Sequence, residues 1–194
     1  VNAEYANLIV TRDSLSSSMG STIASLIQYY TETEGESAAW DYIAGLSANT
    51  KNYYNSGSMM FQAVGKDEAA ISMAVINDVF TNRDENEMPI EIVIPESGAI
   101  VITDCVAAIK DAPHPNAAAA FMEFIGSEEA QLLTAKEYNR MPVITSILAD
   151  CPAWMQTEFS VLDVDWSVIS ENKTTWLQTW ETDYIDANKT VAKE

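Results

Sequence analysis

Two short segments rich in serine and glycine are places where this chain could hold a small polar molecule. Their candidate binding residues are Ser17, Ser18, Gly20 and Ser21 in the first segment and Ser56, Gly57 and Ser58 in the second. Each segment precedes apolar residues at helical spacing, which predicts that each forms the first turn of a helix. Such a turn presents unpaired backbone N–H groups and the positive end of the helix dipole. Two turns that face one groove would bind an anionic or polyoxygenated solute. Ordinary helix capping by serine is the alternative.

Residue patterns for catalysis are missing from the sequence. His114 is the only histidine, and its place between Pro113 and Pro115 predicts a surface turn. The sequence contains no Gly-x-Ser-x-Gly, no phosphate-binding loop, no Gly-x-Gly-x-x-Gly and no His-Glu-x-x-His motif. We therefore predict that the protein is not an enzyme and uses no cofactor.

The metal-binding possibilities are few. Cys105 and Cys151 have no CxxC spacing and no histidine-rich surroundings, so a zinc site is not expected. Two buried free thiols are the simpler interpretation, and a single disulfide in an oxidising compartment is the alternative. Tyr53 and Tyr54 could contact a ligand or bind ferric iron through their phenolates, but no His, Asp or Glu partner lies nearby in sequence. We predict no metal.

Composition narrows the range of partners. The chain has 194 residues, 47% of them hydrophobic, which is enough for a real core. Its formal net charge is -19, from 29 acidic and 10 basic residues, and this charge opposes binding to nucleic acid or to anionic membranes. No apolar run approaches the ~20 residues that span a bilayer, so membrane insertion of this segment is not expected.

Short β-type runs alternate with longer helical patterns, which predicts an α/β fold. Asn116 and Ser127 are expected to cap two of the helices. The expected strands lie at residues 7–10, 69–75, 90–94, 99–103 and 106–110. The expected helices begin near residues 18–21, after Gly35, after the turn at 55–58, and at 116 and 127, and one long helix spans residues 167–187.

The order of several short motifs resembles a known family. Ser-Met-Gly-Ser-Thr at residues 18–22 is followed by Trp-Asp-Tyr at 40–42, Tyr-Asn-Ser-Gly-Ser at 54–58 and Gly-Lys-Asp-Glu-Ala-Ala-Ile at 65–71. Later come Pro-Glu-Ser-Gly at 95–98, an alanine- and phenylalanine-rich helix at 115–124, Ser-Glu-Glu-Ala-Gln at 127–131 and Trp-Leu-x-x-Trp at 176–180. This ordered set resembles the type 2 periplasmic solute-binding proteins of the ferric-iron, phosphonate, thiamine and sugar-phosphate group.

The resemblance implies a fold and a division of the chain. The fold would be a periplasmic-binding-protein type 2 lobe, a mixed sheet flanked by helices, with elements of the other lobe. Residues 6–95 would form the second lobe with the binding turns. Residues 96–145 would cross over to complete the first lobe, and residues 146–194 would pack back on the second. The first residue is Val1, not methionine, and we expect that an N-terminal part of the family pattern is missing. Apolar faces of residues 106–125 would then be exposed and covered by rearranged packing, a companion segment or a dimer.

The resemblance also implies a function. The protein would be the extracytoplasmic solute-binding component of an ABC importer, in the periplasm or on the cell surface as a lipoprotein. Its partners would be a small polar or anionic solute and the permease subunits. With so few basic residues, neutralisation of an anion would depend on backbone dipoles, on Arg12 or on the missing lobe. The alternative is a ligand-sensing domain of the same fold in a receptor or regulator.

Overall fold

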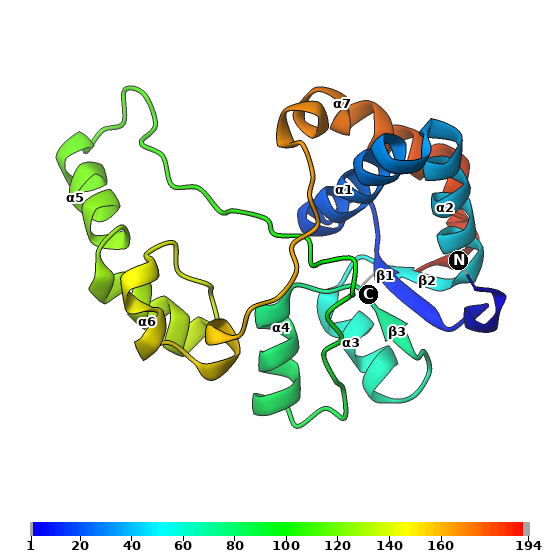
Figure 1. Cartoon of the computed structure of the whole chain (residues 1–194), viewed down its shortest axis with the longest axis horizontal. Helices are drawn as coiled ribbons and strands as arrows, with labels where there is room; N and C mark the ends of the chain where they lie inside the picture. The colour runs from blue at the N-terminus through cyan, green and yellow to red at the C-terminus, as the bar shows by residue number, and fades with distance from the viewer. Residues whose placement is uncertain (1, 192–194) are drawn as a thin grey trace. The chain divides into compact units, whose positions relative to one another are not determined.

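The computed structural model describes residues 2–191, which divide into two compact units. Unit 1 contains the described residues up to Val101 and those from Val161 onward, and unit 2 is Ile102–Ser160. The predicted α/β class is confirmed, since parallel strands alternate with helices along unit 1 (Figure 1). The division into lobes at residues 95 and 145 stays a prediction.

Unit 1 is built on a parallel sheet. The strands β1 (Ile9–Arg12), β2 (Thr50–Tyr54), β3 (Ile71–Ser72) and β4 (Thr190–Val191) lie in the order β3-β1-β2-β4. In the β1–β2 pair, Thr11 lies opposite Tyr53 and Arg12 opposite Tyr54. Because β1 and β2 are parallel neighbours, their carboxyl ends lie at the same edge of the sheet.

Helices cover both faces of this sheet, because side chains of successive strand residues point to opposite sides. One face presents Ile9 and Tyr53 to α1 (Ser17–Glu34), α2 (Glu36–Asn49) and α7 (Trp166–Thr179). The other face presents Val10 and Tyr54 to α3 (Gly57–Gly65) and to α4 (Ile76–Phe80). Figure 1 shows α1, α2 and α7 on one side of the strands and α3 on the other.

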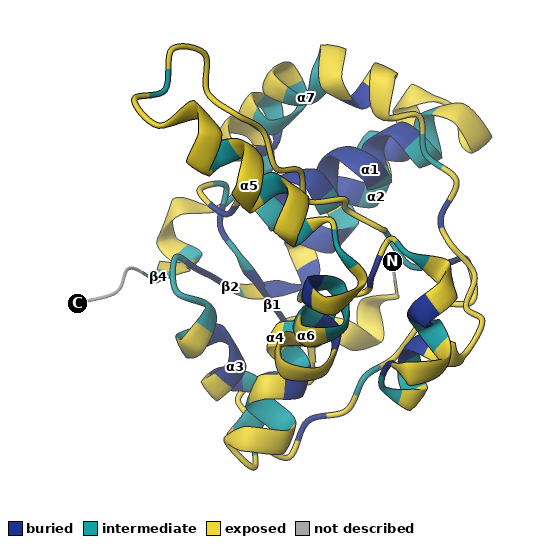
Figure 2. Cartoon of the chain, turned by 90° about the vertical axis from the view of Figure 1, so that its left-hand side faces the viewer, coloured by how far each residue is buried: buried dark blue, intermediate teal, exposed yellow. Residues whose placement is uncertain are grey.

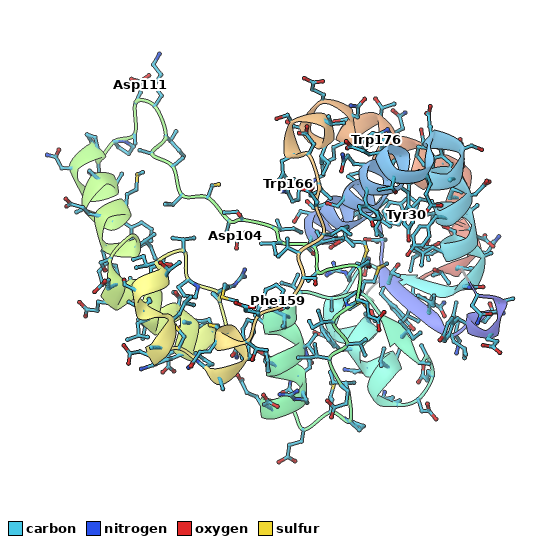
Figure 3. All side chains as sticks on the ribbon, in the orientation of Figure 1. Tyr30, Asp104, Asp111, Phe159, Trp166 and Trp176 are labelled. Atoms are coloured by element: carbon cyan, nitrogen blue, oxygen red, sulfur yellow. The ribbon has the colours of Figure 1, made fainter. Side chains whose placement is uncertain are left out.

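The helix starts follow local capping rules. The Ser16 hydroxyl accepts a hydrogen bond from the Met19 N–H of α1, and Asp165 accepts from the Ser167 and Val168 N–H groups of α7. Aromatic rings then fill the space between helices. Figure 3 labels Tyr30 and Trp176, which pack against the core of unit 1, and Trp166, which is exposed. Of the C-terminal tryptophans, Trp180 is buried in this core and Trp176 packs against it, whereas Trp166 does not belong to it.

Unit 2 contains α5 (Pro115–Ile125), α6 (Glu128–Tyr138) and the 3-10 segments Thr145–Asp150 and Ala153–Gln156. Ser127 caps α6, as predicted, through the Ala130 N–H. Asn116 does not cap α5, because Pro115 occupies the first turn and His114 is the cap residue. The small core of unit 2 is Ala135, Ile147, Cys151 and Met155. Figure 2 shows α5 as mostly exposed, and none of its residues is buried.

The stretch that precedes α5 differs from the sequence prediction. Residues 90–94, 99–103 and 106–110 form no strand, and the single bridge in this region joins Ala99 to Val161. A strand needs a continuous hydrogen-bonded neighbour, and within the described residues these segments have only this one bridge. The predicted exposure of apolar side chains is confirmed for Val106, Ile109, Phe121 and Phe124. Cys105 is exposed, contrary to prediction, while Cys151 is buried, and both are free thiols.

Two other elements are shorter than predicted. The buried strand expected at residues 69–75 is reduced to β3, which pairs with β1 over two residues. The long helix expected at residues 167–187 ends as α7 at Thr179 and continues as one π-helical segment, Trp180–Tyr184. The chain then turns back into β4, because Thr190 and Val191 pair with β2. The continuous helical structure therefore ends three residues before the expected position, and the sheet pairing begins beyond it.

Candidate functional site

The carboxyl ends of β1 and β2, together with the helix starts that follow them, make up the candidate site, which we call the strand-end site. The chain leaves β1 for α1 on one face of the sheet and leaves β2 for α3 on the opposite face. In open α/β sheets, ligands bind where adjacent strands send their helices to opposite faces. Both serine-rich segments lie at this edge, so the structure brings the two predicted turns to one end of the sheet.

The first turn is open at its beginning. Ser17 begins α1 and is exposed, and Ser18 is partly exposed. The Ser18 hydroxyl lies 3.2 Å from the Ser16 hydroxyl. Ser16 itself was not among the predicted site residues, although its serine type and its place before the helix are a capping signal. The hydroxyls of Ser17 and Ser18 remain accessible to a solute.

Gly20 and Ser21, in contrast, face α7. The Ser21 hydroxyl donates to the Ser17 carbonyl oxygen over 3.1 Å and accepts from the Lys173 ammonium over 2.8 Å. A Cβ atom on Gly20 would lie 2.9 Å from the Leu177 Cδ1 atom. The close approach of α1 and α7 is therefore a packing reason for the small residues at positions 20 and 21. Contact of Gly20 or Ser21 with a solute stays a prediction. Sequence reasoning missed Lys173, which lies 152 positions from its partner.

The second turn leaves its helix end uncapped. Ser56 is the cap residue of α3, yet its side chain makes no capping hydrogen bond. Ser56 and Gly57 are partly exposed, and Ser58 is exposed. The first backbone N–H groups of α3 have no intrahelical partner, and here no side chain of Ser56 takes their place. Binding of an oxygen-bearing ligand by this turn stays a prediction.

Arg12, the last residue of β1, holds its side chain against the second turn. Its Nε atom donates to the Tyr54 carbonyl oxygen over 3.1 Å, and its Nη2 atom donates to the Asn55 carbonyl oxygen over 2.9 Å. The Nη1 atom lies 3.4 Å from the place that a Cβ atom on Gly57 would occupy. The guanidinium of the last β1 residue is thereby fixed over the start of α3.

Tyr53 and Tyr54 do not form a joint metal-binding pair. Their side chains enter the cores on opposite faces of the sheet, and both residues are buried. Burial raises the pKa of both phenols above 10.0. Adjacent strand residues point apart by the geometry of the pleat, so the two phenolates cannot bind one ion in this conformation. His114 is exposed, and no group of three or more His, Cys, Asp or Glu side chains gathers as a metal site within residues 2–191.

A pocket of about 670 Å³ lies elsewhere in unit 1, near the carboxyl end of α1 and the start of α7. It does not include the serine-rich turns. Its lining carries several carboxylates and no basic side chain, which disfavours an anion. The lining residues are Tyr29, Glu32, Thr33, Asp163, Val164, Asp165 and Trp166.

Sequence comparison identifies relatives of this chain. Residues 1–172 match the family of bacterial extracellular solute-binding proteins. The chain belongs to this family. A probable ABC transporter periplasmic-binding protein of Sinorhizobium fredii is 22% identical over 161 residues, which cover 80% of this chain and 45% of that protein. The solute-binding chain thus spans less than half the length of this relative.

Solved structures share the fold. Apo ferric ion-binding protein A of Pasteurella haemolytica has a TM-score of 0.74 at 19% identity, covering 96% of this chain and 60% of that one. The periplasmic binding protein AfuA of Actinobacillus pleuropneumoniae, solved with fructose-6-phosphate bound, has a TM-score of 0.71 at 21% identity, covering 94% and 57%. The fold predicted from the resemblance, a periplasmic-binding-protein type 2 lobe, is confirmed. No helix within the described residues combines the length and apolar character needed to cross a membrane.

Proposed function

We propose that this protein is the solute-binding component of a bacterial ABC importer and that it captures a small polar or anionic solute outside the cytoplasm. The strand-end site carries this proposal, because two serine-bearing helix starts follow neighbouring parallel strands at the same edge of the sheet in a member of the solute-binding family. Membership of the extracellular solute-binding family and the likeness to the Sinorhizobium fredii protein support the transport role. Attachment to the cell surface as a lipoprotein is one form that this location would take.

Capture would make or break no covalent bond of the solute. The uncapped amides of α3 and the hydroxyls of Ser17, Ser18, Ser56 and Ser58 would donate hydrogen bonds to the solute's oxygen atoms. Closure of two lobes in the full-length protein would then exclude water, and the closed form would dock on the permease. Helix-end dipoles act at contact distance, so the overall negative charge does not prevent the binding of an anion.

The chemistry of the strand-end site favours an oxyanion over ferric iron. Structural relatives include proteins solved as ferric-binding proteins and one solved with a sugar phosphate. The strand-end site of this chain offers N–H and O–H donors, which suit phosphate-type oxygen atoms. Ferric iron requires anionic or phenolate ligands, and the adjacent tyrosines point to opposite faces of the sheet. We therefore place sugar phosphates and phosphonates before ferric iron.

A ligand screen of the full-length protein tests the proposal. Thermal unfolding and native mass spectrometry would be measured with phosphonates, sugar phosphates, thiamine, polyamines and ferric iron. A solute at 100 times its Kd stabilises the folded state by about 2.7 kcal/mol, which is readily visible as a rise in Tm. A bound mass together with such a rise supports the proposal. Absence of both with every solute class contradicts it.

The apolar side of unit 2 would be covered in the functional protein. Ile109 is 82% exposed and Phe121 56% exposed, which is unusual for side chains of this size. We expect either a second copy of the chain or additional chain of the longer protein to cover this surface. Sedimentation velocity distinguishes coverage by a second copy from coverage by additional chain. If the isolated chain is a dimer and the full-length protein is a monomer, coverage by additional chain is favoured. A monomer in both cases, with Phe121 accessible to solvent, would contradict coverage.

A further inference from the structure

The guanidinium of Arg12 has a fixed orientation and no carboxylate to neutralise it. Two of its nitrogen atoms donate to the carbonyl oxygens of Tyr54 and Asn55 at the end of β2. Among residues 2–191, the ion pairs with carboxylates involve Arg83 and Arg140, and none involves Arg12. The carboxylate of neighbouring Asp13 accepts the Leu15 N–H instead. A positive charge without a carboxylate partner is notable in a chain with 29 acidic and 10 basic residues.

The position of this charge is unfavourable unless an anion joins it. A cation is disfavoured beside the amino end of a helix, where the dipole is already positive. The Nη1 atom of Arg12 nevertheless lies over Gly57, the first residue of α3, and Ser56 does not cap that helix. The Nη1 side of the guanidinium and the first amides of α3, which Ser56 does not cap, therefore present their N–H donors at one place. An anion with several oxygen atoms would satisfy both sets of donors.

We propose that Arg12 is the residue that makes the strand-end site select a phosphate-type oxyanion, such as a phosphate monoester or a phosphonate, over a neutral solute of similar size. This inference rests on the proposed function. Guanidinium nitrogens match the geometry of phosphate oxygens and carry a permanent charge, which lysine reproduces only as a point charge. The two carbonyl contacts hold the Nη1 side of the group toward the start of α3, so little rotamer freedom is lost on binding. Arg12 thereby supplies the charge that the serine hydroxyls lack.

The test compares variants of the full-length protein by isothermal titration calorimetry with inorganic phosphate, glycerol 3-phosphate and glycerol. Arg12→Gln removes the charge, and Arg12→Lys retains it without the planar fork. Lys66→Gln is the matched control, because it removes one positive charge at the exposed carboxyl end of the same helix, α3. Far-UV circular dichroism and the urea midpoint verify that each variant is folded.

We expect the parent protein to bind at least one phosphate probe and to bind glycerol far more weakly. Loss of a charge-assisted hydrogen bond predicts that Arg12→Gln weakens phosphate binding about 10- to 100-fold, with a smaller loss in Arg12→Lys. Lys66→Gln should leave the affinity unchanged. Equal phosphate affinity in the parent and in folded Arg12→Gln would overturn the inference.

The inference and the proposed function can fail separately. If the screen of solutes finds a neutral or cationic ligand and the phosphate probes do not bind, the selection of oxyanions by Arg12 is wrong while solute binding stands. If no solute of any class binds the full-length protein, the proposed function fails and the role of Arg12 fails with it. A phosphate affinity that falls equally in Arg12→Gln and in Lys66→Gln would indicate a general charge effect and would also overturn the inference.

Discussion

Replacing Gly98 by alanine tests the contact between the turn at residues 95–98 and the segment that begins at Val161. Gly98 has a positive φ of +115°, and a Cβ atom there would lie 2.5 Å from the Leu162 N atom and 2.6 Å from the Val161 C atom. Both of these are backbone atoms, so the clash cannot be relieved by a side-chain rotation. Gly98→Ala therefore combines strain at φ with overpacking.

The matched control is Gly35→Ala, at the junction of α1 and α2. Gly35 has a φ of +97° with nothing within 4 Å of the added Cβ atom, so it carries the backbone strain alone. Strain at a glycine-only conformation costs about 1–3 kcal/mol, and overpacking adds about 1–3 kcal/mol. Both substitutions reduce the entropy of the unfolded chain alike, and that effect cancels in the comparison. Gly98→Ala should thus destabilise unit 1 by about 1–3 kcal/mol more than Gly35→Ala.

Urea unfolding followed by tryptophan fluorescence measures this difference, because four of the five tryptophans lie in unit 1. The two glycine variants and the parent chain would be compared by midpoint at constant m-value. Destabilisation of the two variants within about 0.5 kcal/mol of each other, the usual error of such comparisons, would refute the backbone contact as the reason for glycine at position 98.

Three further predictions concern single side chains. Ser127→Ala removes the hydroxyl that accepts the Ala130 N–H and should cost unit 2 about 1 kcal/mol, measured by thermal unfolding; an unchanged Tm would contradict the cap. Trp180→Ala empties a site that is 1% exposed and should cost about 3–5 kcal/mol in urea unfolding, whereas a loss below about 1 kcal/mol would mean that the core collapses around it. Burial raises the pKa of Tyr53 above 10.0 in the folded protein. The contribution of Tyr53 to the unfolding free energy is therefore complete below about pH 10 and is lost as the pH rises through the folded-state pKa. Tyr53→Phe should therefore flatten the alkaline fall in unfolding free energy, and an identical fall in both proteins would contradict this.

The surroundings of Tyr53 set the direction in which its pKa shifts. Desolvation by burial is the largest cause of the raised pKa, the hydroxyls of Ser47 and Thr50 lower it in part, and Asp186 raises it again. No hydrogen bond of good geometry satisfies the Tyr53 hydroxyl within the described structure. The neutral phenol is thus favoured in the folded protein, and ionisation of the unfolded chain above about pH 10 draws the equilibrium toward unfolding.

The sequence alone determined the features that depend on neighbours within one turn of a helix. Ser127 was predicted as a cap and is one, and the serine-rich segments were predicted to begin helices and do so. Capping hydrogen bonds join residues two or three positions apart, so their partners are visible in the chain itself. The ordered motifs were likewise sufficient to identify the solute-binding family, whose match covers residues 1–172.

Only the tertiary structure decided which of these helix starts are free to meet a solute. Gly20 and Ser21 are residue types expected in a binding turn. However, α7, about 150 positions later in the sequence, covers them through Leu177 and Lys173. Arg12 is held by carbonyl groups 42 and 43 positions away, at the end of a neighbouring strand. Strand pairing and helix packing join residues that are distant in sequence, and therefore they determine which donors are already used and which remain available.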